Sequence, residues 1–325
     1  MLREAPQIDN VDTNLLRVFC TVVECGGFTP AQAELNISAS ALSTKMAALE
    51  TRLGMRLCQR GRIGFRLTDK GKSVYAAVQQ LFSAHDDFQA EIGLLRGKLL
   101  GNLHIGMMDN TITNPKARIH QAIARFMRRD HAVNITLDTF QPAMLERGLL
   151  DGKLHIGIAA YYHHVSGLNY ERLFSEQQIL YCGVNHPLFP RVQGRVTLKE
   201  IGASRYVARG YMGRRAGKPT VPMNTAATSY DMESIARFIL SGHFIGYLPA
   251  HYAAPWAERG EMRPIWPDRL NYDSVFEVAT RKDTPKIGIV EAFLEDLKYE
   301  TRGLALTAPR DRRNDDGVAA ATNTG

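Results

Sequence analysis

The sequence predicts an α/β protein with an all-α N-terminal domain, one long linking helix, and a C-terminal domain built around an open sheet. Three observations predict it. Two short helical segments joined by a tight turn occupy residues 28–47, an apolar stripe at the coiled-coil period covers 74–95, and strand and helix patterns alternate beyond Gly101. With 325 residues, the chain is long enough for two or three domains and a substantial core.

Residues 28–47 are typical of a helix-turn-helix. Thr29 and Gln32 match a capping box, with Pro30 at the first helical position, so we expect a helix to begin there. Ser38 can cap the next helix, and Gly54 can end it. The apolar positions of this second helix recur at helical spacing: Leu42, Met46, Leu49 and Leu53.

The outer face of the second helix carries small hydroxyl groups and one cation, which suits close approach to base edges and phosphates. A basic segment with glycines follows, as expected for a wing that lies along a DNA backbone or minor groove. Between Leu15 and Lys72, nine Lys or Arg stand against four Asp or Glu, the excess expected for phosphate contact. The alternative is an ordinary helical hairpin with a solvated polar face, which the basic flank disfavours.

Several motifs run without a gap from about Leu15 to Gly71: Phe-Thr-x-Ala-x-x-x-Leu-x-Ile-Ser-x-Ser-Ala-Leu-Ser, Ala-Leu-Glu, Leu-Gly-x-Arg-Leu and Arg-Leu-Thr-x-x-Gly. Together they resemble the N-terminal domain of LysR-type transcriptional regulators. The resemblance implies a winged helix-turn-helix domain over 12–72, with its motif at about 28–47. Its predicted DNA-binding residues are Thr29, Ser38, Ala39, Ser40, Ser43, Thr44, Lys45, Arg60, Arg62 and Arg66.

Two positions depart from the usual pattern of that family. Ala39 stands where a glutamine is common, and Thr44 where an arginine is common. Both departures remove long side chains that could hydrogen-bond bases or phosphates. We therefore expect this helix to depend more on the shape of the DNA than relatives with the longer residues do.

The apolar stripe after the wing has the 3.5-residue period of a coiled coil, and Thr68 or Asp69 can cap its helix. A helix packed on its own domain usually shows a broader stripe. In LysR-type proteins this segment is the linker helix that pairs two subunits, so we expect dimerisation through residues 73–97. The predicted dimerisation residues are Val74, Val78, Leu81, His85, Phe88, Ile92 and Leu95, of which His85 could fix the register or lie at an interface edge.

Beyond Gly101 the alternation predicts an open, largely parallel sheet covered on both faces. Strands are expected at 103–107, 135–139, 154–159, 179–184, 206–209, 244–248 and 275–280, and helices from Asn114 and over 142–150, 230–240 and 287–298. The LysR resemblance, carried here by Ser-Gly-x-x-Ile-Gly-x-Leu-Pro ending at Pro249, implies an effector domain over 101–303 that looks like a type-2 periplasmic binding protein. Crossovers near Glu171 and Tyr272 would divide it into lobe I, about 101–171 and 273–303, and lobe II, about 172–272.

A ligand site is expected in the cleft between these lobes. Helices that begin just after strands, near Asn114, Gln141 and Ser229, would offer free N–H groups to an anionic metabolite. Asp109 favours instead an amine or a zwitterion such as an amino acid. The plainer alternative is that these polar residues only cap helices. The predicted effector-binding residues are Asn110, Thr111, Thr139, Gln141, Tyr161, His163, Arg209 and Thr228.

No catalytic or metal-binding pattern emerges. Gly71-Lys72-Ser73 matches the end of a phosphate-binding loop, but Arg66 stands where the first glycine belongs. Neither Gly-x-Ser-x-Gly nor His-Glu-x-x-His occurs, the four cysteines lack metal-ligand spacing, and a pair such as His163-His164 is more often solvent-exposed or a pocket wall. We therefore predict no enzyme, cofactor or metal site. The alternative is an α/β enzyme or cytosolic solute-binding protein without a DNA role, which the helix-turn-helix disfavours.

The whole chain is consistent with a cytoplasmic DNA-binding protein. A net charge of +7 favours an acidic partner, no run of about 18 apolar residues suggests a membrane span, and the N-terminus lacks a secretion signal. Residues 304–325 have few apolar anchors and read as a disordered tail. The expected partners are promoter DNA, a small anionic or zwitterionic effector, and further copies of the chain as a homodimer assembling to a homotetramer, with RNA polymerase as a further candidate.

Overall fold

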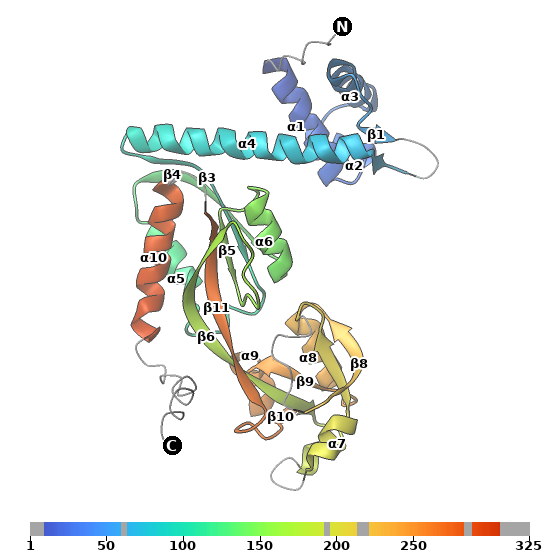
Figure 1. Cartoon of the computed structure of the whole chain (residues 1–325), viewed down its shortest axis with the longest axis vertical. Helices are drawn as coiled ribbons and strands as arrows, with labels where there is room; N and C mark the ends of the chain where they lie inside the picture. The colour runs from blue at the N-terminus through green and yellow to red at the C-terminus, as the bar shows by residue number, and fades with distance from the viewer. Residues whose placement is uncertain (1–9, 60–63, 192–195, 213–220, 283–287, 306–325) are drawn as a thin grey trace, which may run out of the picture. The chain divides into compact units, whose positions relative to one another are not determined.

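The computed structural model describes residues 10–59, 64–191, 196–212, 221–282 and 288–305, and the chain forms two compact units whose boundary lies after Gln89 (Figure 1). The first unit contains the predicted helix-turn-helix. Its elements are α1 (Asn10–Glu24), α2 (Phe28–Leu35), α3 (Ala39–Leu53), β1 (Cys58–Gln59) and β2 (Arg66–Leu67). Phe19, Leu42, Met46 and Leu57 are fully buried at its centre. The apolar positions of α3 that the sequence indicated therefore form the core of this domain.

The caps of α2 and α3 differ from each other. Ser38 caps α3, since its hydroxyl accepts a hydrogen bond of 3.2 Å from the backbone N–H of Ala41, and Gly54 ends the helix in the left-handed conformation at φ 63°. The predicted capping box of α2 is wrong. Gly27 occupies the N-cap, so the helix begins one residue before Thr29, and the Gln32 side chain donates instead to the Phe28 carbonyl at 3.3 Å.

The wing is a short antiparallel hairpin in which Cys58 pairs with Leu67 and Gln59 with Arg66. The predicted wing residues Arg60 and Arg62 lie between these strands, outside the described residues. Helix α4 (Asp69–Leu95) follows at once. It is capped by Thr68, whose hydroxyl accepts from the Gly71 N–H at 2.9 Å and donates to the Arg56 carbonyl at 2.8 Å.

The second unit is built on one mixed sheet with the strand order β4-β3-β5-β11-β6-β9-β7-β8, with β10 attached to β6. At one end β3 (Leu99–Met107), β4 (His131–Thr139) and β5 (Ile156–Ala159) run parallel. At the other end β7 (Arg205–Arg209), β8 (Asn224–Ser229) and β9 (Ile245–Pro249) run parallel. Between them β6 (Leu168–Gly183), β10 (Met262–Pro264) and β11 (Asn271–Arg281) pair antiparallel. The expectation of a largely parallel sheet thus holds for the two ends and is wrong for the middle.

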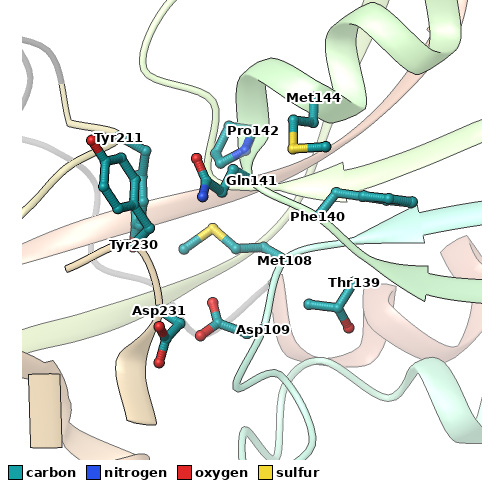
Figure 2. Close-up of a pocket in the computed structure, with 10 residues that line it drawn as sticks. All are labelled: Met108, Asp109, Thr139, Phe140, Gln141, Pro142, Met144, Tyr211, Tyr230 and Asp231. Carbon is teal, nitrogen blue, oxygen red and sulfur yellow. The ribbon is translucent and has the colours of Figure 1, made fainter. Parts of the chain in front are cut away.

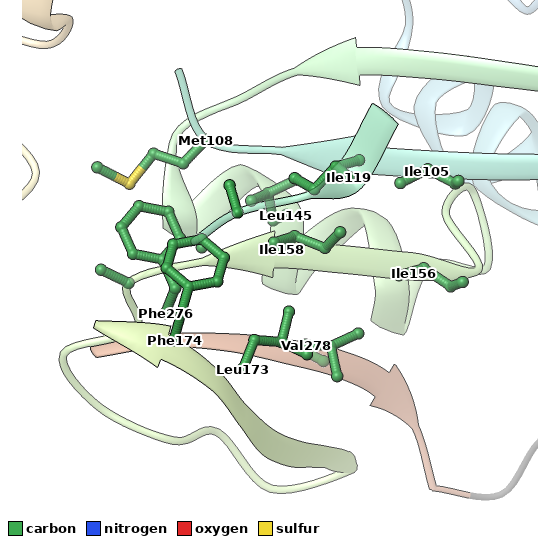
Figure 3. Packing of buried hydrophobic residues seen from close by; sticks show 14 of the residues in the cluster. Ile105, Met108, Ile119, Leu145, Ile156, Ile158, Leu173, Phe174, Phe276 and Val278 are labelled. Carbon is green, nitrogen blue, oxygen red and sulfur yellow. The ribbon is translucent and has the colours of Figure 1, made fainter. Parts of the chain in front are cut away.

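We call the first parallel end lobe I and the second lobe II. Lobe I carries α5 (Ile119–Phe126), α6 (Pro142–Leu150) and α10 (Gly288–Ala305), and α5 and α10 lie side by side (Figure 1). Figure 3 shows its core, in which Ile105, Ile158 and Leu145 are fully buried beside the stacked rings of Phe174 and Phe276, 4.8 Å apart. Lobe II carries the 3-10 turn η1 (Phe189–Arg191), α7 (Leu198–Ala203), α8 (Met232–Leu240) and α9 (Ala250–Glu258).

The chain passes between the lobes on the paired strands β6 and β11. Strand β5 of lobe I meets β11 at 277–279, opposite 170–172 of β6, whereas β9 of lobe II meets β6 from Gln178 onward. Tyr272 faces Gln178 across the ladder, and Glu171 faces Val278. The passage therefore occupies about 173–177 and 272–276, so the expected crossover at Glu171 lies a few residues before it.

The segment after β3 is not the helix that Asn114 was expected to open. The Asn114 side chain accepts from the Lys116 N–H at 2.9 Å and so stabilises a turn, and α5 begins only at Ile119. A free helix N-terminus at Asn114 is therefore absent. Over the described ranges, none of the helices combines the length and apolar character needed to span a membrane.

Candidate functional site

The first candidate site is the outer face of α3. Ala39, Ser40 and Thr44 are exposed there, and Ser43 and Lys45 are partly buried. Thr44 donates its hydroxyl to the Ser40 carbonyl at 2.9 Å, and the Ser38 and Ser40 hydroxyls lie 3.0 Å apart. These short side chains stay close to the helix. The first two turns of α3 therefore present a slim surface that can approach the floor of a DNA groove.

Glu50 positions the wing against α3, a role that sequence reasoning missed. Its Oε1 accepts from the backbone N–H of Leu57 at 2.7 Å and of Cys58 at 3.2 Å. One carboxylate thus satisfies two backbone donors at the start of β1. The Ala-Leu-Glu motif was the only signal for it. Arg66 on β2 and Thr29 on α2 are both exposed.

The predicted stripe on α4 is buried at its start and exposed further on. Val78 is only 4% exposed and packs in the core of the helix-turn-helix domain, with Val74 partly buried beside it. Leu81 is 42% exposed, Phe88 60% and Leu95 78%. His85 is exposed, and Ile92 is partly buried. The second half of the predicted stripe is therefore an exposed apolar row in the single chain.

A pocket of about 280 Å³ lies between the lobes (Figure 2). Residues from the ends of β3 and β4 and the start of α6 form its lobe I wall, and two loops form its lobe II wall. The lining residues are Met108, Asp109, Thr139, Phe140, Gln141, Pro142 and Met144 from lobe I and Tyr211, Tyr230 and Asp231 from lobe II. Two carboxylates and no Lys or Arg are among them.

The Asp109 side chain is held by two hydrogen bonds. Its Oδ2 accepts from the Met232 N–H at 2.8 Å and from the Asn110 side chain at 3.0 Å. Burial raises the pKa of this carboxyl, and the Met232 hydrogen bond opposes that rise. Asp231 caps α8 by accepting from the Ser234 N–H at 2.7 Å. The pocket is therefore acidic, with both carboxylates held in place.

A buried polar network lies where the strands pass between the lobes. The Arg209 guanidinium donates to the Gln178 side chain, to the Tyr247 carbonyl at 3.1 Å and to the Tyr272 hydroxyl at 3.2 Å. Glu176, two residues from Gln178, accepts from Gln178 Nε2 at 2.6 Å and from Asn114 Nδ2 at 3.4 Å, and lies 2.9 Å from His251 Nε2. Groups from both lobes are thus joined in one chain of hydrogen bonds.

The structure brings some of the predicted effector residues together and leaves others apart. Thr139 and Gln141 line the pocket, and Asn110 contacts Asp109 at its edge. Thr111 and Tyr161 are buried outside the lining, Arg209 lies in the polar network, His163 is exposed beside Glu146, and Thr228 is exposed on β8. Sequence reasoning missed the apolar lobe I residues of the lining, because it considered only polar side chains there; these are Met108, Phe140, Pro142 and Met144. It also missed Tyr211, Tyr230 and Asp231, because the lobe II loops meet lobe I only in the folded chain.

The described residues show no cluster of three or more His, Cys, Asp or Glu able to hold a metal ion. The four cysteines form no disulfide, and burial raises the pKa of the Cys20 and Cys182 thiols to about 12. These thiols are therefore protonated and unreactive in the folded protein near neutral pH.

Comparison with known proteins places these features in a family. Residues 13–72 match the model described as bacterial regulatory helix-turn-helix protein, lysR family, and residues 96–302 match the LysR substrate binding domain. The HTH-type transcriptional activator BauR of Pseudomonas aeruginosa is 42% identical over 290 residues, which is 89% of this chain and 95% of that protein. The HTH-type transcriptional regulator PtxR of the same species is 24% identical over 304 residues, 90% of this chain and 94% of its own length.

Solved structures agree on the fold. The full-length CbnR structure in complex with its target DNA has a TM-score of 0.61 at 17% identity, over 89% of this chain and 99% of that one. A second crystal structure, of CbnR described as a LysR family transcriptional regulator, has a TM-score of 0.60 at 18% identity. It covers 89% of this chain and 99% of that one. The chain belongs to the LysR family and is a DNA-binding transcriptional regulator with a substrate-binding domain, not an enzyme.

Proposed function

We propose that this regulator reads promoter DNA with the first turns of α3, holds the DNA backbone with its wing, and changes its DNA binding when a small metabolite enters the pocket between the lobes. The pocket is the observation that carries the proposal. Its walls come from both lobes, so an occupant contacts lobe I and lobe II at once and favours one arrangement of them. The proposed DNA contacts are Ser40, Ser43, Thr44, Lys45 and Arg66, together with Arg60 and Arg62.

We further propose that the chain acts in the cytoplasm as a homodimer paired through the exposed row on α4, with two dimers joined through their effector domains. The exposed apolar side chains of Leu81, Phe88 and Leu95 support the pairing. A two-fold dimer places its recognition helices on half-sites separated by whole helical turns. The position of the operator in the promoter would then determine whether the bound regulator contacts RNA polymerase.

Mapping the DNA that the protein protects upstream of its own gene, with and without candidate metabolites, tests this function. We expect a protected site with two-fold symmetry whose extent changes with the effector. Arg66→Ala should weaken binding to all sequences alike and lower the salt slope by about one, because one phosphate contact is lost. Arg259→Ala, an exposed arginine of lobe II, is the control and should leave the slope unchanged. A protein that protects no DNA would contradict the proposal.

A further inference from the structure

Four buried polar groups around the passage between the lobes have no hydrogen-bond partner among the described residues. They are Arg209 Nε, the hydroxyls of Tyr162 and Tyr211, and Ser274 Oγ. Leaving such donors unpaired in the interior is costly, because they lose water and gain nothing in return. A further group that accepts hydrogen bonds would remove this cost.

The strand register places Ser274 beside the groups that hold Arg209. Tyr272 is the ladder partner of Gln178, and Ser274 is the partner of Glu176, two positions further along both strands. Their side chains therefore lie on the same face of the β6–β11 pair as the groups that hold Arg209. The rings of Tyr162 and Tyr211 stack at 6.4 Å, and both lie within the electrostatic reach of Arg209.

The chemistry of this cluster is that of an anion site. Each unpaired group is a donor or a hydroxyl that can donate, and the arginine is a permanent cation. Among the described residues, the direct polar contacts of Arg209 are to an amide, a carbonyl and a phenol, and the Glu176 carboxylate lies within its electrostatic reach without an ion pair. A carboxylate is the acceptor that guanidinium groups and hydroxyls bind most readily in proteins.

Tyr211 joins this cluster to the acidic pocket. It lines the pocket with Asp109 and Asp231 and stacks on Tyr162 on the other side. Asp109 and Arg209 also lie within electrostatic reach of each other. A positive group is favoured at the aspartates and a negative group at the arginine, with one tyrosine between them. The anionic effector considered from the sequence would meet two carboxylates and no Lys or Arg among the residues that line the pocket.

We propose that the effector is a small zwitterion, with its carboxylate held by Arg209 Nε and the hydroxyls of Tyr162, Tyr211 and Ser274 and its ammonium group held by Asp109 and Asp231. This inference rests on the proposed function, since it names the ligand class of the same cleft. A bound zwitterion would contact Asp109 and Tyr162 of lobe I and Arg209 and Tyr211 of lobe II. Binding would therefore be coupled to the arrangement of the lobes.

Calorimetric titration of the full-length protein tests the inference. The probes are straight-chain amino acids from glycine to 5-aminopentanoate, which vary the charge separation, with propanoate and propylamine as singly charged analogues. We expect one chain length to bind about a hundredfold more tightly than either analogue, because only the amino acid pairs both charges. Equal affinity for propanoate, propylamine and every amino acid would overturn the proposal.

Isosteric variants locate the two ends of the ligand. Tyr211→Phe and Tyr162→Phe remove one hydroxyl each, and we expect each to weaken the best amino acid about tenfold while propylamine binds as before. Asp109→Asn should weaken the amino acid and leave propanoate unchanged. Tyr161→Phe is the matched control, because its hydroxyl is also buried and unpartnered but lies outside the cluster, where its ring meets Tyr170. An equal loss in Tyr161→Phe would overturn the assignment.

Measuring DNA binding of each variant without ligand shows that it is folded and separates this inference from the proposed function. Suppose that the protein protects DNA and binds a ligand, but the affinity for that ligand is unchanged in Tyr162→Phe and Tyr211→Phe. This result would refute the carboxylate site and leave the proposed function standing. The carboxylate site is equally refuted if no zwitterion binds. A melting temperature that is lowered in both variants would then show that buried water already pairs the hydroxyls. Absence of any protected DNA would refute the proposed function itself.

Discussion

Asp109 Oδ2 accepts a hydrogen bond of 2.8 Å from the backbone N–H of Met232, so a carboxylate at the end of β3 is bound to the first turn of α8 in the other lobe. The contact combines a charge-assisted hydrogen bond with the partial positive charge of a helix N-terminus. It is a direct link between the lobes in the wall of the pocket, and its strength depends on the charge of one carboxyl group.

The pH dependence of stability should reflect this carboxyl. Burial raises the pKa of Asp109 in the folded state above its value in the unfolded chain. The contribution of Asp109 to the free energy of unfolding is therefore fully present below the pKa of the unfolded state. It is lost as the pH rises through the pKa of the folded state. We expect the melting temperature of Asp109→Asn minus that of the wild type to increase as the pH rises from about 4 to 7. A constant difference across this range would contradict the prediction, and Asp130→Asn, at an exposed position, is the control.

Removing the Glu50 carboxylate should loosen the wing. Glu50→Ala leaves the N–H groups of Leu57 and Cys58 without their acceptor, at a cost of about 1–3 kcal/mol in the free energy of unfolding. Glu50→Gln keeps an acceptor oxygen and should lose less. Urea unfolding and DNA affinity measure both effects. Glu34→Gln, on the exposed side of α2, should leave stability unchanged, and an equal loss there would indicate a general charge effect.

Gly71→Ala should destabilise the DNA-binding domain although it adds a good helix former. A Cβ at this position would lie 1.9 Å from the Leu57 carbonyl oxygen, so the start of α4 or the strand beside it must move. We expect a loss of about 3 kcal/mol or more in the free energy of unfolding. The reverse change at an exposed position of the same helix, Ala76→Gly, should cost only about 1 kcal/mol. Near-neutral behaviour of Gly71→Ala would show that the close approach can relax.

Charges on the exposed row of α4 should separate the subunits. Leu81→Glu and Phe88→Glu place a carboxylate in the proposed seam, where it would be buried without a partner. Because Leu81 is 42% and Phe88 60% exposed in the single chain, each monomer should stay folded. Analytical ultracentrifugation at micromolar concentration should show dimers or tetramers for the wild type and for Gln80→Glu, and monomers for the two variants. A monomeric wild type would contradict the seam.

The helix-turn-helix could be predicted from the sequence because its determinants are local. Ser38 and Gly54 bound α3 by contacts with residues three or four positions away, and Leu42 and Met46 repeat at the helical period. The prediction for the start of α2 was wrong, because the backbone conformation of one residue determines where that helix begins. Gly27 adopts φ 154° at the N-cap of α2, so the chain enters the helix one residue earlier than the capping-box pattern implied.

The pocket could be predicted only in part, because it depends on contacts between distant segments. Thr139 and Gln141 follow a strand that the alternation revealed, whereas Tyr211, Tyr230 and Asp231 reach the pocket through the register of lobe II. Strand β8 has the sequence Asn-Thr-Ala-Ala-Thr-Ser, with no apolar alternation, and takes its strand form from pairing with β7. The partners of Arg209 lie 31 to 63 positions away in the chain, beyond the reach of any local pattern.

The β6–β11 ladder determines what kind of motion a ligand can produce. The two connections between the lobes are hydrogen-bonded to each other from Leu168 opposite Arg281 to Ile179 opposite Asn271. Such a ribbon resists stretching and sliding, because both would break ladder bonds, but it yields to torsion about its long axis. An effector in the pocket would therefore turn one lobe against the other through a small angle. Under the proposed function, we therefore expect the response of this domain to an effector to be a rotation of the lobes about the ladder rather than an opening.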